Sequence, residues 1–174
     1  ESANQDTLNR IRKELAVSDI VKSCKLARQA GLYPHITTMF GYPWEGKNEA
    51  LNTLRLGKWL LKKGYAYTMQ ATVVIPYPGS TLFEECKKNN LLQNMNWSRY
   101  DMKKPIMKTS LSDKEIMGFV RSIYSVPLNP EFFFRKILSI NDVYDIKYFM
   151  RAASRTIGHI FDFRNKKKNC RIIL

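Results

Sequence analysis

Apolar residues follow two different periods along the first 95 residues. They recur at helical spacing between Ser18 and Gly31 and again between Ala50 and Gly64. Two β-branched, apolar runs occupy residues 33–40 and 66–75, and the second is continuous enough for a parallel strand buried on both faces. Helical spacing returns at 82–88. The pattern predicts helix, strand, helix, strand, helix, which is the order of a parallel βαβ arrangement.

Short-range signals predict where these elements begin and end. Polar side chains are placed to accept hydrogen bonds as helix N-caps at Asn4 or Asp6, Ser18, Ser80 and Ser112. Glu115 completes a capping-box pattern with Ser112. Gly31 and Gly64 are placed to end helices, and Gly57 interrupts the apolar stripe of the helix between the two strands.

Each predicted strand ends in a loop rich in glycine and proline. The first loop is Gly41-Tyr-Pro-Trp-Glu-Gly46, with one carboxylate, and the second is Pro76-Tyr-Pro-Gly-Ser80. Loops at the carboxyl ends of parallel strands gather at one end of a sheet or barrel, where ligands bind. A plain βα turn is the simpler interpretation of either loop alone. Polar residues 1–5 are expected to form a third loop at the same end.

The pattern changes after about residue 95. Residues 96–109 predict an extended basic loop, and apolar spacing then predicts a helix that carries Ile116, Phe119, Val120 and Ile123, one after Pro130 and one over 143–161. Residues 1–95 carry 13 Lys/Arg and 8 Asp/Glu, net +5, whereas residues 96–174 carry 16 and 7, net +9. We therefore expect two parts, an α/β part at 1–95 and a basic, mainly α-helical extension at 96–174.

Composition excludes several classes of protein. With 44% hydrophobic and 25% charged residues, the chain is typical of a globular domain, and no apolar run is long enough to span a membrane.

Without a signal-peptide pattern the protein is expected to be cytoplasmic, and its polar start at Glu1 suggests a fragment or processed piece. Cys24, Cys86 and Cys170 are too widely spaced for a local metal site, and His35 and His159 have no ligand-spaced partner.

Three ordered stretches within about residues 1–130 resemble one family. Glu1-Ser-Ala-Asn-Gln5, Met39-Phe-Gly-Tyr-Pro-Trp-Glu45 and Ile75-Pro-Tyr-Pro-Gly-Ser-Thr-Leu-Phe-Glu84 resemble the ends of the fourth, fifth and sixth strands of a radical S-adenosylmethionine (SAM) enzyme. The similar branch is the one associated with cobalamin domains, which includes the anaerobic magnesium-protoporphyrin ester cyclase. Two departures are Ala3, where glycine is usual, and Trp44, where a small residue is usual.

The resemblance implies the C-terminal half of a TIM-like radical SAM barrel at 1–95, followed by the helical extension. It also implies a SAM site. Glu1 and Ser2 would contact the ribose and amino-acid part, Lys13 the carboxylate, and Met39 the adenine, with Gly41 and Glu45 in the loop beside it. Ile75 and Pro76 would line the other side of the base. The catalytic residues are not identified.

The family's 4Fe-4S cluster is held by a CxxxCxxC loop, which this sequence lacks, as it lacks the DxHxxG signature of a cobalamin domain. Both would lie upstream, so no metal ligand is expected in this chain, and the chain alone is expected to be inactive. In the parent enzyme the resemblance implies SAM cleavage that drives methylation, cyclisation or rearrangement of an organic substrate, with a reductant protein to supply the cluster.

Two other interpretations stay open. A basic α/β module that binds or modifies nucleic acid would use the net +9 of the C-terminal part and its aromatic residues Tyr100, Tyr144, Tyr148 and Phe161. Peripheral membrane contact through the basic tail from Lys166 to Leu174 would suit a lipid-like or tetrapyrrole substrate.

Overall fold

The computed structural model describes residues 1–125, 146–147, 150–151 and 154. Residues Glu1–Val126 form one compact unit and Pro127–Leu174 a second, and every element with described bounds lies in the first. The helices predicted after Pro130 and over 143–161 lie outside the described residues, apart from helical positions 146–147, 150–151 and 154. The same holds for the tail from Lys166. The division at residue 95 stays a prediction.

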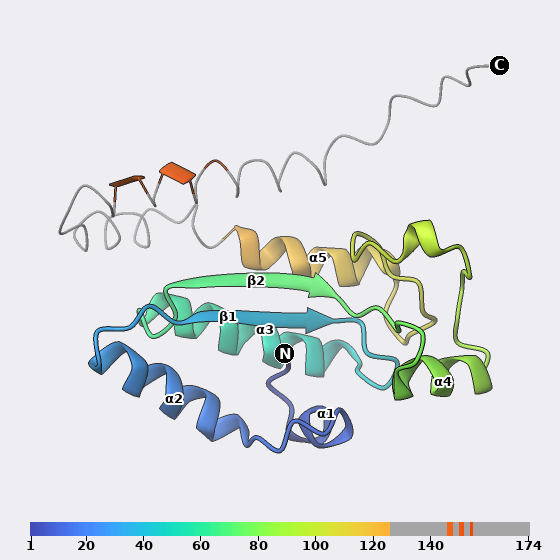
Figure 1. Ribbon diagram of the computed structural model, residues 1–174, viewed down its shortest axis with the longest axis horizontal. Coiled ribbons are helices and arrows are strands. Elements are labelled where there is room, and N and C mark those ends of the chain that lie inside the picture. The colour runs from blue at the N-terminus through green and yellow to red at the C-terminus, as the bar shows by residue number, and fades with distance from the viewer. Residues whose placement is uncertain (126–145, 148–149, 152–153, 155–174) are drawn as a thin grey trace. The chain divides into compact units, whose positions relative to one another are not determined.

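The order of elements in the first unit follows the predicted order (Figure 1). It runs α1 Gln5–Arg10, α2 Val17–Gln29, β1 His35–Phe40, α3 Lys47–Lys62, β2 Thr68–Val73, α4 Thr81–Lys88, a short 3-10 turn η1 at Trp97–Arg99, and α5 Asp113–Tyr124. The mixed α/β prediction is confirmed. Both strands are shorter than their apolar runs, because β1 begins two residues after the start of its run and β2 leaves out two residues at each end of its run.

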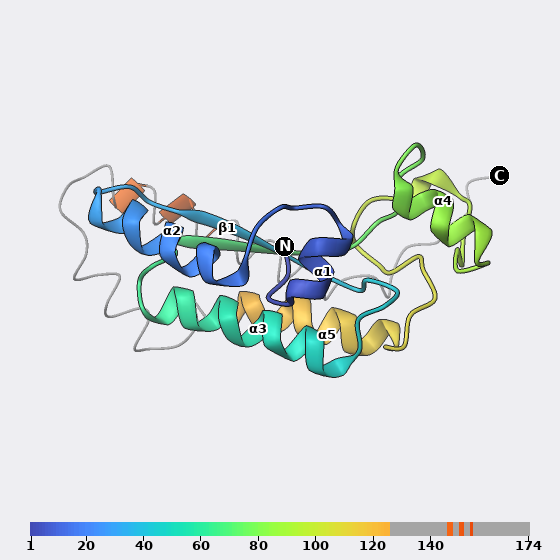
Figure 2. The ribbon, with the colours of Figure 1, turned by 90° about the horizontal axis from the view of Figure 1, so that it is seen from below.

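The two strands pair in parallel, from His35 opposite Thr68 to Phe40 opposite Val73. Helix α3 makes the crossover between them, and α3 and α5 pack on each other and on the sheet from the same side (Figure 2). Phe40 of β1 stacks on Phe119 of α5, with ring centroids 5.7 Å apart. The described sheet therefore has one βαβ unit with two helices on one face, and closure into a barrel stays a prediction.

The outer edges of the two strands are occupied differently. On β1, the backbone N–H of Met39 donates to the carbonyl of Glu1 at 2.9 Å. On β2, the hydroxyl of Tyr124 accepts from the Ala71 N–H at 3.3 Å and donates to the Ala71 carbonyl at 3.0 Å. The start of the chain therefore bonds to the outer edge of β1. At the outer edge of β2, the side chain of Tyr124 makes the hydrogen bonds that a further strand would otherwise make.

Helix ends test the predicted caps. Ser80 accepts from the N–H of Phe83, and Ser112 forms the predicted capping box with Glu115, so both predictions are confirmed. The prediction for Ser18 is wrong, because α2 begins at Val17 with Ala16 at its N-cap, and the carboxylate of Asp19 accepts from the Ala16 N–H at 3.2 Å. Asn4 does stand at the N-cap of α1, but its side chain makes no capping hydrogen bond.

Helix α3 runs without a break through Gly57, which the sequence marked as an interruption of its apolar stripe. A Cβ at this position would lie 2.9 Å from the sulfur of Met69 in β2 and 3.3 Å from Ile123 in α5. The missing side chain lets the helix approach the sheet and α5 closely, which explains the glycine.

Candidate functional site

The predicted site lies where both strands end. The β1 and β2 arrows point to the same end of the unit, and the loops after them lie there with α4 (Figure 1). The first residues of the chain join this end through the bond between Glu1 and Met39, the second-last residue of β1. The predicted gathering of the polar segments at the strand ends therefore holds for residues 1–4 and 41–45.

The carboxylate of Glu45 is the centre of this region. Its side chain is almost wholly enclosed, with 1% of the residue exposed. Oε1 accepts hydrogen bonds from the hydroxyl of Ser2 at 2.8 Å, the hydroxyl of Thr7 at 2.7 Å and the amide of Asn4 at 3.2 Å. A charged acceptor with three donors on one oxygen ties the first loop to the start of the chain and to α1.

The second carboxylate oxygen of Glu45 differs sharply from the first. Oε2 is buried and has no hydrogen-bond partner among the described residues. Such a group is uncommon, because an unsatisfied buried acceptor costs free energy. Oε2 is thus the one atom of this carboxylate that can take a further donor.

Helix α3 fixes the first residues in place. The hydroxyl of Thr53 accepts from the N–H of Ala3 at 3.0 Å, and the Asn4 amide donates to the carbonyl of Glu49 at 2.9 Å. Asn4 therefore serves the contact with α3 and Glu45 in place of capping α1. Thr7 and Thr53 were not predicted as site residues, since a single threonine in a helical stretch carries no local signal of such a role.

Glu1 and Lys13 form an ion pair at 2.9 Å that remains open to solvent, with 26% and 45% of the two side chains exposed. Met39, which is half-buried, donates its backbone N–H to the Glu1 carbonyl, and its sulfur is 3.7 Å from the hydroxyl of Tyr42. Burial, helped by the carboxylates of Glu1 and Glu45, raises the pKa of the Tyr42 phenol. Glu1 is thus joined to Lys13 through its side chain and to Met39, near the end of β1, through its backbone.

Gly41, Ile75 and Pro76 are the remaining predicted residues. Gly41 has a φ of 97°, and a Cβ there would come within 3.2 Å of Ile116 in α5, so this backbone favours glycine. Ile75 is buried in a separate cluster with Tyr100 and Ile106, and Pro76 is fully buried.

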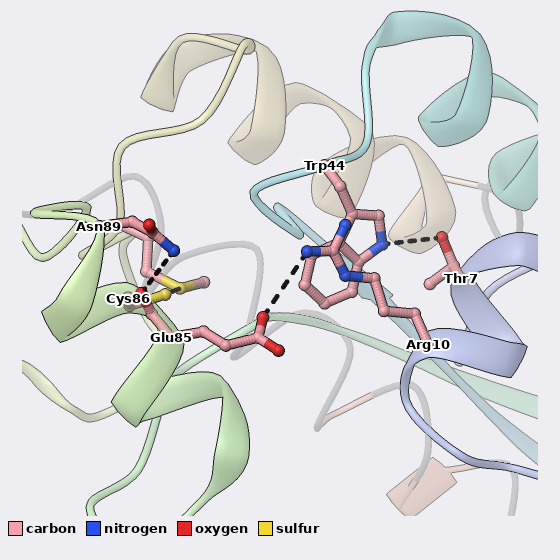
Figure 3. A network of polar contacts seen from close by, with 7 residues as sticks. Thr7, Arg10, Trp44, Glu85, Cys86 and Asn89 are labelled. Carbon is pink, nitrogen blue, oxygen red and sulfur yellow. Dashed lines mark hydrogen bonds and ion pairs between the residues drawn. The ribbon is translucent and has the colours of Figure 1, made fainter.

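The side chain of Trp44 contacts two residues of α1 (Figure 3). The guanidinium of Arg10 lies 4.1 Å from the centroid of its ring, and Arg10 also reaches Glu85 of α4 at 3.6 Å. The indole N–H donates to the hydroxyl of Thr7 at 3.2 Å, and the ring stacks on Tyr42. The large side chain of Trp44 therefore links the first loop to α1 directly and to α4 through Arg10.

Metal-binding side chains are dispersed in the described part of the chain. No group of three or more His, Cys, Asp or Glu residues there could hold a metal ion. Cys24 and Cys86 are free thiols, and burial raises the pKa of each. Cys86, whose side chain is drawn in Figure 3, contacts the sulfur of Met107 at 3.4 Å. His35 contacts the Thr68 hydroxyl.

The structure also bears in part on membrane spanning and on the aromatic residues of the nucleic-acid interpretation. Among the described residues, no helix is long and apolar enough to cross a membrane. Of the four aromatic residues that the nucleic-acid interpretation used, Tyr100 is buried, and Tyr144, Tyr148 and Phe161 lie outside the described residues.

Comparison with known proteins gives a partial match. No family model matches the chain. Over 146 residues, the chain is 31% identical to an uncharacterized methyltransferase of Pyrococcus horikoshii. The match covers 83% of this chain but 30% of that protein, so the chain spans about a third of the length of its curated relative.

Proposed function

We propose that the chain is part of a SAM-dependent enzyme of the radical SAM superfamily, in which residues 1–95 are the last βα units of a partial barrel. One observation carries the proposal. The residues that resemble the family's fourth- and fifth-strand ends are joined in space through Glu45, although 43 residues separate Ser2 from Glu45 in the sequence. The name of the curated relative supports methyl transfer as the reaction class.

The strand edges support a larger parallel sheet. In this arrangement β1 has a strand on each side, one being β2 and the other a strand that ends at Glu1, as the bond from Met39 suggests. The hydroxyl of Tyr124 then marks β2 as the last strand, because it satisfies the outward N–H and carbonyl of Ala71. A partial barrel that ends at β2 fits both edges.

The open ion pair fits one end of SAM. The methionine part of SAM carries a carboxylate and an ammonium group, which would pair with Lys13 and Glu1 respectively. Met39 offers an apolar surface beside them. In this proposal Glu45 does not touch SAM through Oε1, which Ser2, Thr7 and Asn4 already occupy, but acts as a positioning residue for Glu1 and Ser2.

The described residues do not fit a 4Fe-4S cluster, which needs several thiolates at one place. Cluster and cobalamin sites are therefore assigned to other parts of the parent enzyme, and no step is derived through them. SAM, when bound, would supply the methyl group or the adenosyl group that reacts. The residues of this chain bind and orient it, and they shield it from water.

Equilibrium dialysis of labelled SAM against the parent enzyme tests the assigned ion pair. Lys13→Ala is expected to raise the Kd for SAM about tenfold, since it removes one charge-assisted contact. Lys22→Ala, an exposed cation on α2, is the matched control and should leave the Kd unchanged. Equal affinities for the wild type and both variants would contradict the assignment of Lys13.

A further inference from the structure

A compact loop at residues 93–106 lies outside the proposed SAM site. Its ends are held together by the antiparallel bridge between Leu92 and Met107 and by the Gln93 N–H, which donates to the Ile106 carbonyl at 2.8 Å. Closed ends and internal packing are the features of an Ω-loop. The loop and α4 belong to the chain segment that follows β2, at the end of the unit to which both strands point (Figure 1).

Hydrogen bonds within the loop, and one to the segment after β2, hold the loop at 93–106 in place. The buried ring of Tyr100 is its core, and the Tyr100 hydroxyl donates to the Asn94 carbonyl at 3.3 Å. Tyr77 donates to the Tyr100 carbonyl at 2.9 Å, which holds the loop to the segment after β2. The side chain of Asn96 accepts from the Ser98 N–H at 3.1 Å and fixes the turn at η1.

Three large apolar side chains of this loop are exposed to solvent. Trp97 is 56% exposed, Met95 53% and Met102 38%. The Trp97 ring is supported from beneath by Tyr100 at 4.9 Å and by Phe83 of α4 at 6.3 Å between centroids. Three exposed apolar side chains thus lie within eight residues of one loop.

Exposed basic residues lie in the same loop and at the end of α4. Arg99, Lys103 and Lys104 are exposed in the loop, and Lys87 and Lys88 are exposed at the end of α4. Asp101 is the acidic residue within 93–106, and it pairs with Lys103 at 3.3 Å. A tryptophan and two methionines amid lysine and arginine match the layered chemistry of an anionic bilayer surface, which has phosphates outside and acyl chains beneath.

We propose that the loop at 93–106 docks the protein on an anionic lipid surface, with Met95, Trp97 and Met102 inserted and the surrounding cations on the headgroups. Single-stranded nucleic acid fits less well. Bases stack on aromatic faces, whereas two of the three projecting side chains are thioethers, and the Tyr100 ring is buried. This proposal does not depend on the SAM site.

Vesicle co-sedimentation of the full chain tests the proposal, with vesicles of phosphatidylcholine alone or mixed with phosphatidylserine. The chain should sediment with the mixed vesicles. Met95→Ser/Trp97→Ser and Lys103→Glu/Lys104→Glu should each lower the partition coefficient at least about tenfold. Trp59→Ser, which changes an exposed tryptophan of α3, and Lys22→Glu/Lys63→Glu are the matched controls and should bind as the wild type does.

Circular dichroism of each variant checks that the fold is retained, as expected for changes at exposed side chains. Three results would overturn the proposal. The first is absence of sedimentation with mixed vesicles. The second is sedimentation that both loop variants leave unchanged, which would place membrane binding elsewhere, for example in the tail from Lys166. The third is tight, Trp97-dependent binding of a single-stranded oligonucleotide without any binding to vesicles.

Discussion

The hydroxyl of Ser2 donates a hydrogen bond to Oε1 of Glu45 over 2.8 Å. Both residues are buried, and the bond joins the start of the chain to the loop after β1. It makes the first loop a support for the first residues, where a sequence alone suggests a carboxylate facing a ligand. The geometry of the proposed site depends on this contact and on the two other donors to the same oxygen.

Removal of the Glu45 carboxylate should destabilise the unit strongly. Glu45→Ala leaves the donors of Ser2, Thr7 and Asn4 without their shared acceptor and is expected to cost about 2–4 kcal/mol in the free energy of unfolding. Glu45→Gln keeps one acceptor oxygen and should cost less. Urea unfolding measures both, and Glu84→Gln on the exposed surface of α4 is the control, expected within about 0.5 kcal/mol of the wild type. An equally small effect at Glu45 would contradict this account of the network.

The hydroxyl of Tyr124 should protect one backbone position of β2. Tyr124→Phe removes the group that bonds to the N–H and carbonyl of Ala71, at a cost of about 1 kcal/mol. Amide hydrogen exchange at Ala71 should become faster than in the wild type, while exchange within the β1–β2 pairing should change little. Unchanged exchange at Ala71 would mean that Tyr124 does not satisfy this edge.

Arg10 and Trp44 should be energetically coupled. A double-mutant cycle with Arg10→Met and Trp44→Leu is expected to give a coupling energy of about 0.5–1 kcal/mol from the contact between guanidinium and ring. Glu85→Gln should cost less than about 1 kcal/mol, because its ion pair with Arg10 is exposed. Additive effects of the Arg10 and Trp44 changes would show that the contact contributes nothing to stability.

Tyr42 should make the protein sensitive to alkali. Because burial raises its pKa in the folded state, its contribution is fully present below the unfolded pKa of about 10 and is lost as pH rises from there toward the folded value. Tyr42→Phe should therefore reduce the loss of stability above pH of about 10, as measured by denaturant unfolding at several pH values. Tyr33→Phe, at an exposed tyrosine, controls for the removal of one phenol. Identical pH profiles for the wild type and Tyr42→Phe would contradict the assignment.

Elements set by nearby residues could be predicted from the sequence. The βαβ order follows from apolar periodicity, and the caps at Ser80 and Ser112 follow from donors within three residues of each side chain. The error at Ser18 has the same local scale, since Asp19 competes as the acceptor that starts α2.

Features set by distant residues could not be predicted in this way. The burial of Glu45, and the use of Asn4 to hold α3 in place of capping α1, depend on contacts 41 to 45 residues apart in the sequence. The packing of Ile75 against Tyr100 and Ile106 likewise depends on residues far away in the sequence. From the spacing of residue types one could predict that the polar segments gather at the strand ends. The partners of each side chain there depend on tertiary packing and could not be predicted.

Product analysis of the parent enzyme tests most directly whether this chain belongs to a radical SAM site. Enzyme with a reconstituted 4Fe-4S cluster is incubated with SAM and a reductant, and the products are separated by chromatography. We predict that the wild type forms 5'-deoxyadenosine. The amount formed should be lower for Lys13→Ala and unchanged for Lys22→Ala. Formation of S-adenosylhomocysteine with no 5'-deoxyadenosine would contradict the radical assignment and would leave a methyltransferase of another mechanism.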